Sequence, residues 1–144
     1  MRVVIDNNII LDALNPNPQF EYEAQKILRL AAEKKINGYI NANSLTDIFY
    51  VLRKTHGIIK AKDILSKLFL IVDIIGIEPI DCVDALNKPM NDFEDALVEV
   101  CATKIKADYI VSRDETFIKS AENIEIIKPA QLLKINDRKE IADN

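Results

Sequence analysis

The sequence predicts a single α/β domain in which helices cover both faces of a parallel sheet. Short apolar runs alternate along the chain with segments of helical spacing, the pattern of parallel strands joined by crossover helices. The 144 residues are 49% hydrophobic and 29% charged, which suits one domain with a buried core. No repeat or linker divides the chain. Residues 1–135 are therefore expected to form the domain, and residues 136–144 a polar, frayed tail.

Short apolar runs predict the strands, because parallel strands are buried on both faces. In chain order, the expected strands are residues 2–5, 39–41, 75–80, 109–111 and 124–127. The first run ends directly before Asp6, and the fourth is followed by Ser112-Arg113-Asp114. Acidic residues thus follow two of the predicted strands.

Apolar side chains at helical spacing predict the elements between the strands. In chain order, the expected helices are residues 7–14, 19–35, 44–56, 58–74, 81–86, 93–106, 115–120 and 129–135. Asn15-Pro16-Asn17-Pro18 is expected to end the first helix and Asn37-Gly38 the second. Ser44, with Asp47 three residues later, is close to a capping box at the third.

The composition excludes several classes of function. A net charge of −4 argues against a protein that holds nucleic acid by bulk positive charge, although carboxylates that bind metal ions also contribute negative charge. Two distant cysteines and one histidine argue against a zinc site and favour reduced thiols. No apolar run is long enough to span a membrane, and the N-terminus does not resemble a signal peptide, so a cytoplasmic location is expected.

The candidate chemistry lies in aspartates at strand ends and helix starts. Asp6 and Asp114 follow strands, while Asp47, Asp92 and Asp95 lie near the starts of helices. In open α/β sheets, sites lie at the carboxyl ends of the strands. Carboxylates packed together repel one another, and hard divalent ions prefer such oxygen ligands. Bound Mg²⁺ or Mn²⁺ would activate water and offset charge on a phosphodiester.

Each aspartate also has a purely structural explanation. Asp6, Asp92 and Asp114 could each cap the helix that follows, and an acid such as Asp47 is favoured in the first turn of any helix. Only the joint placement of these residues favours a metal site.

Four segments resemble the motifs of PIN domains in order and spacing. These are Val-Val-Ile-Asp-Asn-Asn from residue 3, Asn-Ser-Leu-Thr-Asp-Ile from residue 43, Asn-Asp-Phe-Glu-Asp-Ala-Leu from residue 91, and Asp-Tyr-Ile-Val-Ser-Arg-Asp-Glu-Thr-Phe from residue 108. The last two are the most specific. The resemblance covers the chain to about Ile135 and implies a three-layer α/β/α sandwich with about five mostly parallel strands.

The resemblance also implies an endoribonuclease that depends on Mg²⁺ or Mn²⁺. Carried over by position, the catalytic acids are Asp6, Asp47, Asp95 and Asp114, and the metal ligands are Asp6, Asp92, Asp95 and Asp114. Asn8 would support Asp6, and Ser112 would orient the last acid or a water on the metal. Arg113 is a candidate for phosphate contact, or it pairs with a neighbouring acid.

One departure concerns the second motif, where the family more often has Glu and this chain has Asp47. The shorter side chain puts direct ligation in doubt. The resemblance further implies a homodimer and a toxin–antitoxin role of the VapC kind, with RNA as substrate and an antitoxin protein as partner.

Two other functions remain open. One is a non-catalytic module of the same fold that binds RNA or protein, which the shortened Asp47 favours. The other is a receiver-like phosphoacceptor domain, which would leave Asp95 and Asp114 unexplained and lacks a pair of acids after the first strand.

Overall fold

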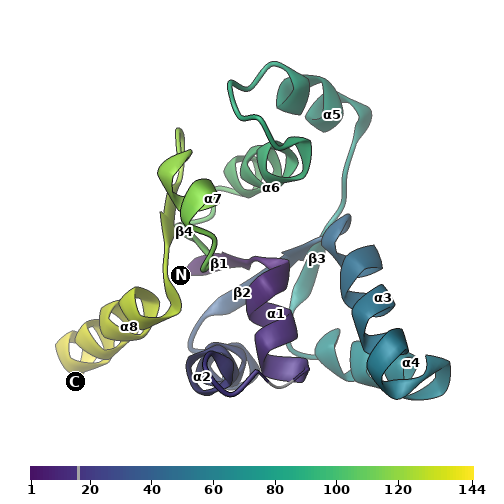
Figure 1. Ribbon diagram of the computed structural model, residues 1–144. Coiled ribbons are helices and arrows are strands. Elements are labelled where there is room, and N and C mark those ends of the chain that lie inside the picture. The colour runs from purple at the N-terminus through teal and green to yellow at the C-terminus, as the bar shows by residue number, and fades with distance from the viewer. Residues whose placement is uncertain (16) are drawn as a thin grey trace.

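The computed structural model describes residues 1–15 and 17–144. Within these residues, five strands form one sheet in the order β3-β2-β1-β4-β5, and all neighbouring strands are parallel. The strands are β1 (Arg2–Ile5), β2 (Asn37–Asn41), β3 (Asp73–Ile75), β4 (Tyr109–Val111) and β5 (Glu125–Ile127). Figure 1 shows β1 and β2 at the centre of the molecule. The predicted parallel α/β fold is confirmed.

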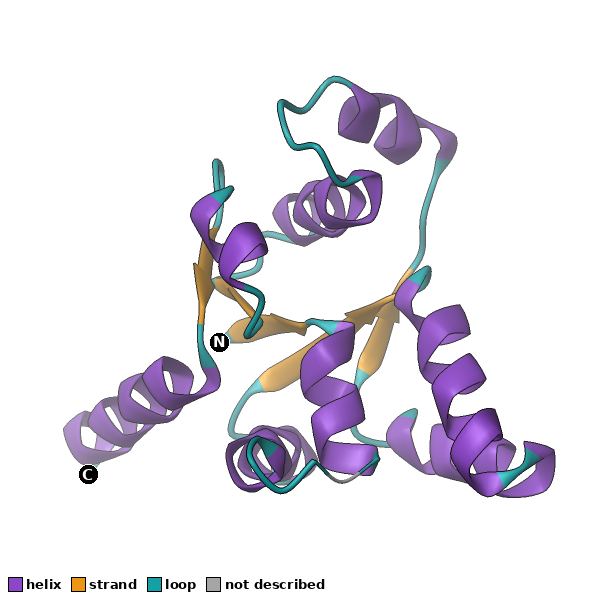
Figure 2. Ribbon diagram, viewed as in Figure 1, coloured by secondary structure: helices purple, strands orange, loops and turns teal. Residues whose placement is uncertain are grey.

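Helices pack on both faces of the sheet, as Figure 2 shows. They are α1 (Asn7–Leu14), α2 (Glu21–Ala32), α3 (Ser44–His56), α4 (Ile58–Leu68), α5 (Pro79–Leu86), α6 (Phe93–Lys104), α7 (Glu115–Lys119) and α8 (Pro129–Asp143). Successive side chains of a strand point to opposite faces. Val3 and Ile5 therefore join the core beneath α1–α4 and α8, whereas Val4 joins the core beneath α5–α7.

The strand order places a switch point beside β1. From β1 the chain moves outward to β2 and β3, crosses the other face through α5 and α6, and returns as β4 on the opposite side of β1. Ligands of open α/β sheets bind where the order reverses in this way, at the carboxyl ends of the strands. The ends of β1 and β4 are therefore the expected position of a site.

The expected boundary between the fourth helix and the third strand differs from the observed one. Residues 58–74 were expected to be one helix and residues 75–80 a strand, but α4 ends at Leu68 and β3 is Asp73–Ile75. The run from Leu68 to Ile77 is apolar except at Asp73 and Gly76, so its periodicity does not separate helix from strand. Pairing with β2 decides the outcome, since Tyr39 is in register with Asp73.

Asn37-Gly38 was expected to end the second helix but opens β2 instead. The helix has already ended at Ala32, and Lys34 adopts a positive φ of 60°. Gly38 has a packing reason to lack a side chain, because an added Cβ would lie 3.1 Å from Cβ of Ala31. The expected stop at Asn15-Pro16-Asn17-Pro18 lies partly outside the described residues; α1 ends at Leu14.

Residues 136–144 were expected to fray, but α8 continues to Asp143. Asn136 is buried, and the ammonium of Lys35 lies 3.0 Å from Oε1 of Glu140, so the tail packs beside the end of α2. The helix extends past the expected end at Ile135, and the contact with Lys35 that accompanies this extension is far away in sequence.

Two remaining expectations concern the thiols and membrane spans. Cys82 and Cys101 are both free, as expected. Within the described part of the chain, no helix has the length and apolar character needed to cross a membrane.

Candidate functional site

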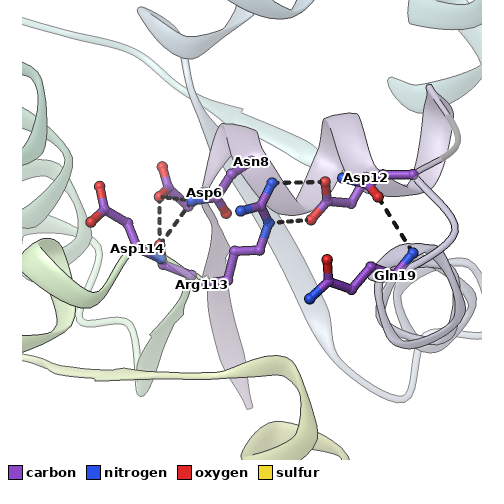
Figure 3. A network of polar contacts seen from close by, with 8 residues as sticks. Asp6, Asn8, Asp12, Gln19, Arg113 and Asp114 are labelled. Atoms are coloured by element: carbon purple, nitrogen blue, oxygen red, sulfur yellow. Dashed lines mark hydrogen bonds and ion pairs between the residues drawn. The ribbon is translucent and has the colours of Figure 1, made fainter.

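Asp6 lies at the carboxyl end of β1 and is 7% exposed. Its Oδ1 accepts a hydrogen bond from the backbone N–H of Asn7 at 3.0 Å. Its Oδ2 accepts from Oγ of Ser112 at 2.7 Å and from Nδ2 of Asn8 at 3.2 Å. Figure 3 shows this network. The hydrogen bond from Asn8 to Asp6 is the one that the family resemblance implies.

Ser112 joins the ends of the two central strands. It follows β4 and is fully buried. Besides donating to Asp6, its Oγ accepts from the backbone N–H of Asp114 at 3.1 Å and from Nδ2 of Asn8 at 3.2 Å. Ser112 therefore contacts the carboxylate of the first acid and the backbone of the last, rather than the carboxylate of the last.

Asp92 and Asp114 cap helices, as their structural explanation predicted. Oδ1 of Asp92 accepts from the N–H of Asp95 at 3.1 Å, at the start of α6. Oδ1 of Asp114 accepts from the N–H of Thr116 at 3.0 Å and of Phe117 at 3.4 Å, at the start of α7. Within the described residues, no hydrogen bond uses Oδ2 of either carboxylate. Capping therefore occupies one oxygen and leaves the other available.

The acids lie close enough to perturb one another. Burial raises the pKa of Asp95 from 3.8 to about 7, and the negative charges of Asp92, Asp6, Asp114 and Glu94 add to the increase. Burial also raises the pKa of Asp6, as do the charges of Asp114 and Asp92, while hydrogen bonds from Ser112 and Asn7 oppose it. Asp6, Asp92, Asp95 and Asp114 are called the acid cluster below.

Asp47 affects Glu94, an acid that the sequence analysis missed and that is also affected by Asp6 and Asp92. Asp47 is exposed in the first turn of α3. Burial raises the pKa of Glu94, and the charges of Asp47, Asp6 and Asp92 raise it further. Nδ2 of Asn7 lies 3.4 Å from Oε1 of Glu94. The signal was present in the Asp-Phe-Glu-Asp segment, but a glutamate in a first helical turn is common for structural reasons.

Arg113 forms an ion pair with Asp12, so its alternative explanation is confirmed. Its Nε and Nη2 donate to the two carboxylate oxygens of Asp12 at 2.6 and 3.2 Å. Asp12 lies on α1 and is 4% exposed. The guanidinium also stacks on the ring of Phe20, 4.1 Å from its centroid. Figure 3 shows Arg113 turned away from Asp6 and toward Asp12.

The donor set of the cluster suits a hard divalent cation. All its side chains offer carboxylate oxygens, and a bound cation would relieve the repulsion that adds to the raised pKa of Asp6 and of Asp95. Oδ1 of Asn8 is buried without a hydrogen-bond partner beside Asp6. Within residues 1–15 and 17–144, no group of three or more histidine, cysteine, aspartate or glutamate side chains is arranged so that it could hold a metal ion.

A parallel sheet covered by helices, with polar groups at its switch point, defines the class of α/β domains whose ligand sites lie at this edge. The family model described as PIN domain matches residues 2–116. The chain therefore belongs to the PIN domain family, whose members are generally nucleases.

Solved structures of VapC-type proteins share the fold. VapBC2 from Rickettsia felis, bound to a promoter DNA fragment, has a TM-score of 0.68 at 18% identity over 89% of this chain and 98% of that chain. VapC20 from Mycobacterium tuberculosis, a toxin that cleaves the sarcin–ricin loop, has 0.65 at 15% identity, covering 83% and 95%. DNA-bound VapBC from Salmonella typhimurium has 0.69 at 10% identity, covering 90% and 98%. No curated protein sequence matches the chain.

Proposed function

We propose that this chain is an endoribonuclease that depends on Mg²⁺ or Mn²⁺ and hydrolyses phosphodiester bonds in RNA. One observation carries the proposal: half-buried Asp95 has a pKa raised to about 7 within a cluster of acids at the switch point of the sheet. Strongly perturbed carboxylates beside the ends of parallel strands are typical of catalytic sites. Membership of the PIN domain family supports the same activity.

Each side chain has a proposed role. Asp6, Asp92, Asp95 and Asp114 would hold the cation, which supplies an activated water and offsets charge on the phosphate. Ser112 and Asn8 fix the rotamer of Asp6 through their hydrogen bonds. Asp47 acts through its neighbour Glu94 rather than by direct ligation, in keeping with its exposed position and its short side chain.

The cellular role that we propose is the toxin of a toxin–antitoxin pair that works as a homodimer. Solved complexes from Rickettsia felis, Klebsiella pneumoniae and Salmonella typhimurium with this fold support a protein partner. Exposed Ile80, Val83 and Leu86 recur at three-residue spacing along α5, which supports a contact surface on that helix. Light scattering coupled to gel filtration, together with growth after induced expression, tests both points.

Cleavage of labelled RNA tests the enzymatic proposal. The wild type is expected to cut in Mn²⁺ or Mg²⁺ and to stop when a chelator is added, and Asp6→Asn is expected to lose most activity. Asp137→Asn is a matched control, because Asp137 is exposed on α8, far along the chain from the cluster. Inactivity on varied RNAs with either metal refutes the proposal.

The alternative function is an RNA- or protein-binding module without catalysis. The exposed position of Asp47, whose charge raises the pKa of Glu94, is the observation that favours it. Retention of RNA by the metal-loaded protein without any cut product distinguishes this function from the enzyme.

A further inference from the structure

A cleft of about 440 Å³ lies beside the acid cluster. It is lined by residues from both ends of the chain: from α1 and the start of α2, and from the segments that follow β4 and β5. Its volume is within the range of about 300–1,000 Å³ of small-molecule sites. None of the roles proposed above uses this cleft.

Arg113 forms a fixed, flat platform in the cleft. The two bonds to buried Asp12 and the stack on Phe20 hold its guanidinium in one orientation. The side chain of Arg113 is still 37% exposed, and Phe20 is partly exposed in the same cleft. Within the described residues, no hydrogen bond uses its Nη1 group. The guanidinium can therefore donate to a ligand without giving up Asp12.

The charge of the lining argues against a phosphate as the occupant. The lining contains Arg113 and Lys128 as cations, and Asp12, Glu23 and Glu115 as carboxylates, so its formal charge is −1. Asp12 already neutralises Arg113, and Glu115 pairs with Lys128. A second anion would meet no unpaired cation. The cleft instead suits a neutral, planar group that carries both acceptors and donors.

A nucleobase has these properties. Bases stack on aromatic rings and on arginine guanidinium planes, and arginine donates to the O6 and N7 acceptors of guanine. Glu23 is exposed in the lining and offers a carboxylate to amino or imino donors of the same base. Figure 3 shows the amide of Gln19, another lining residue, extending toward the side of the cleft that Arg113 occupies.

The cleft is next to the proposed reaction centre. Arg113 and Asp114 are consecutive, and Ile9, which also lines the cleft, follows Asn8. A base is joined to its phosphate through a single ribose, so a phosphate at the acid cluster would place a base of the same strand at the cleft entrance. We propose that this cleft binds a purine base, preferably guanine, of the RNA strand beside the cleaved phosphate. The proposal rests on the ribonuclease function.

Binding of mononucleotides tests the cleft separately from catalysis. In metal-free wild-type protein, 5′-GMP is expected to shift the backbone amide resonances of Gln19, Phe20 and Arg113, and 5′-UMP to shift them less. Inorganic phosphate is expected to leave them unchanged. Equal shifts with phosphate, or no shift with any nucleotide, overturn the proposal. The proposal is also overturned if a lysine- and arginine-rich peptide shifts these resonances and the nucleotides do not.

Cleavage preference tests the cleft during turnover. Phe20→Ala and Gln19→Ala are each expected to reduce the preference for guanine at one position near the cut by about tenfold. Gln19 is exposed, so its variant is not expected to unfold. Tyr22→Ala is the control, since Tyr22 is 68% exposed on α2 and does not line the cleft.

The outcomes separate the two proposals. Active variants with an unchanged preference overturn the nucleobase site and leave the ribonuclease intact. A wild type that cuts no RNA refutes the ribonuclease, and the mononucleotide titration then decides by itself whether the cleft binds a base.

Discussion

The hydroxyl of Ser112 donates a 2.7 Å hydrogen bond to the carboxylate of Asp6, and both side chains are buried. This bond links the end of β4 to the end of β1, where the strand order reverses. It also lowers the pKa of Asp6, against the effect of burial and of the neighbouring acids. One serine thus connects the fold to the ionisation of the proposed site.

Ser112→Ala is expected to lower the free energy of unfolding by about 1–3 kcal/mol, because a buried carboxylate loses a donor. Cleavage is expected to fall about 10–100-fold, the usual effect of removing a group that orients a metal ligand. Urea unfolding and initial cleavage rates measure these effects. Ser66→Ala is the control, since the Ser66 hydroxyl donates an exposed hydrogen bond to the backbone carbonyl of Asp63. Unchanged stability and rate would contradict the role of Ser112.

Asp95 is expected to make the metal-free protein less stable as pH rises from about 4 to about 7. Its pKa is 3.8 when unfolded and about 7 when folded, so in this window the folded chain keeps a proton that the unfolded chain releases. Above pH 7 the folded state holds an unfavourable charge. Solvent screening reduces the effect below what the full shift implies, because Asp95 is only half-buried.

Asp95→Asn should therefore melt at a higher temperature than the wild type at pH 8 in a chelator, while the two melt alike near pH 4. Melting curves at both pH values measure the difference. Asp137→Asn should follow the wild type throughout. A variant less stable than the wild type at pH 8 would show that the charge of Asp95 is not destabilising.

Mn²⁺ is expected to stabilise the wild type at pH 8 and to have a smaller effect near pH 5, where Asp95 is protonated. At a concentration one hundred times the Kd, the gain is about 2.7 kcal/mol. The shift in melting temperature on adding Mn²⁺, and its reversal by a chelator, measure the effect. An equal shift in Asp95→Asn would place the bound ion elsewhere.

Glu99→Gln tests a buried charge that supports α6. Glu99 is fully buried, and its Oε1 lies 3.4 Å from the ammonium of Lys88 and accepts from the backbone N–H groups of Glu122 and Asn123. Loss of one member of a buried pair costs about 3–5 kcal/mol, which urea unfolding measures. Glu122→Gln removes the exposed partner of the same lysine and should cost about 0–1 kcal/mol. Similar losses in both variants would contradict this difference.

Much of the site follows from local sequence. Asp6 and Asp114 follow apolar runs, and parallel strands bring their carboxyl ends to one edge, so their proximity is predictable. The caps at Asp92 and Asp114 are also predictable, because each precedes a helix by one residue. These features depend on neighbours within a few positions of the chain.

The features that the sequence analysis left open or placed wrongly depend on distant contacts. Arg113 donates to Asp12, which is 101 positions away in the chain. Glu99 accepts from the backbone of Asn123, in the segment before β5. The boundary between α4 and β3 depends on pairing with β2, and the end of α8 on packing beside Lys35. Local periodicity contains no information on such partners, so these residues become informative only once the fold is known.

The rate of RNA cleavage in Mn²⁺ at pH 8, compared between Asp95→Asn and Asp137→Asn, tests the central claim most directly. Both substitutions remove one carboxylate charge, but only Asp95 belongs to the acid cluster. Asp95→Asn is expected to lose most of the activity and to remain folded, whereas Asp137→Asn should cut as fast as the wild type. Equal rates in the two variants would contradict a metal-dependent ribonuclease site at the ends of β1 and β4.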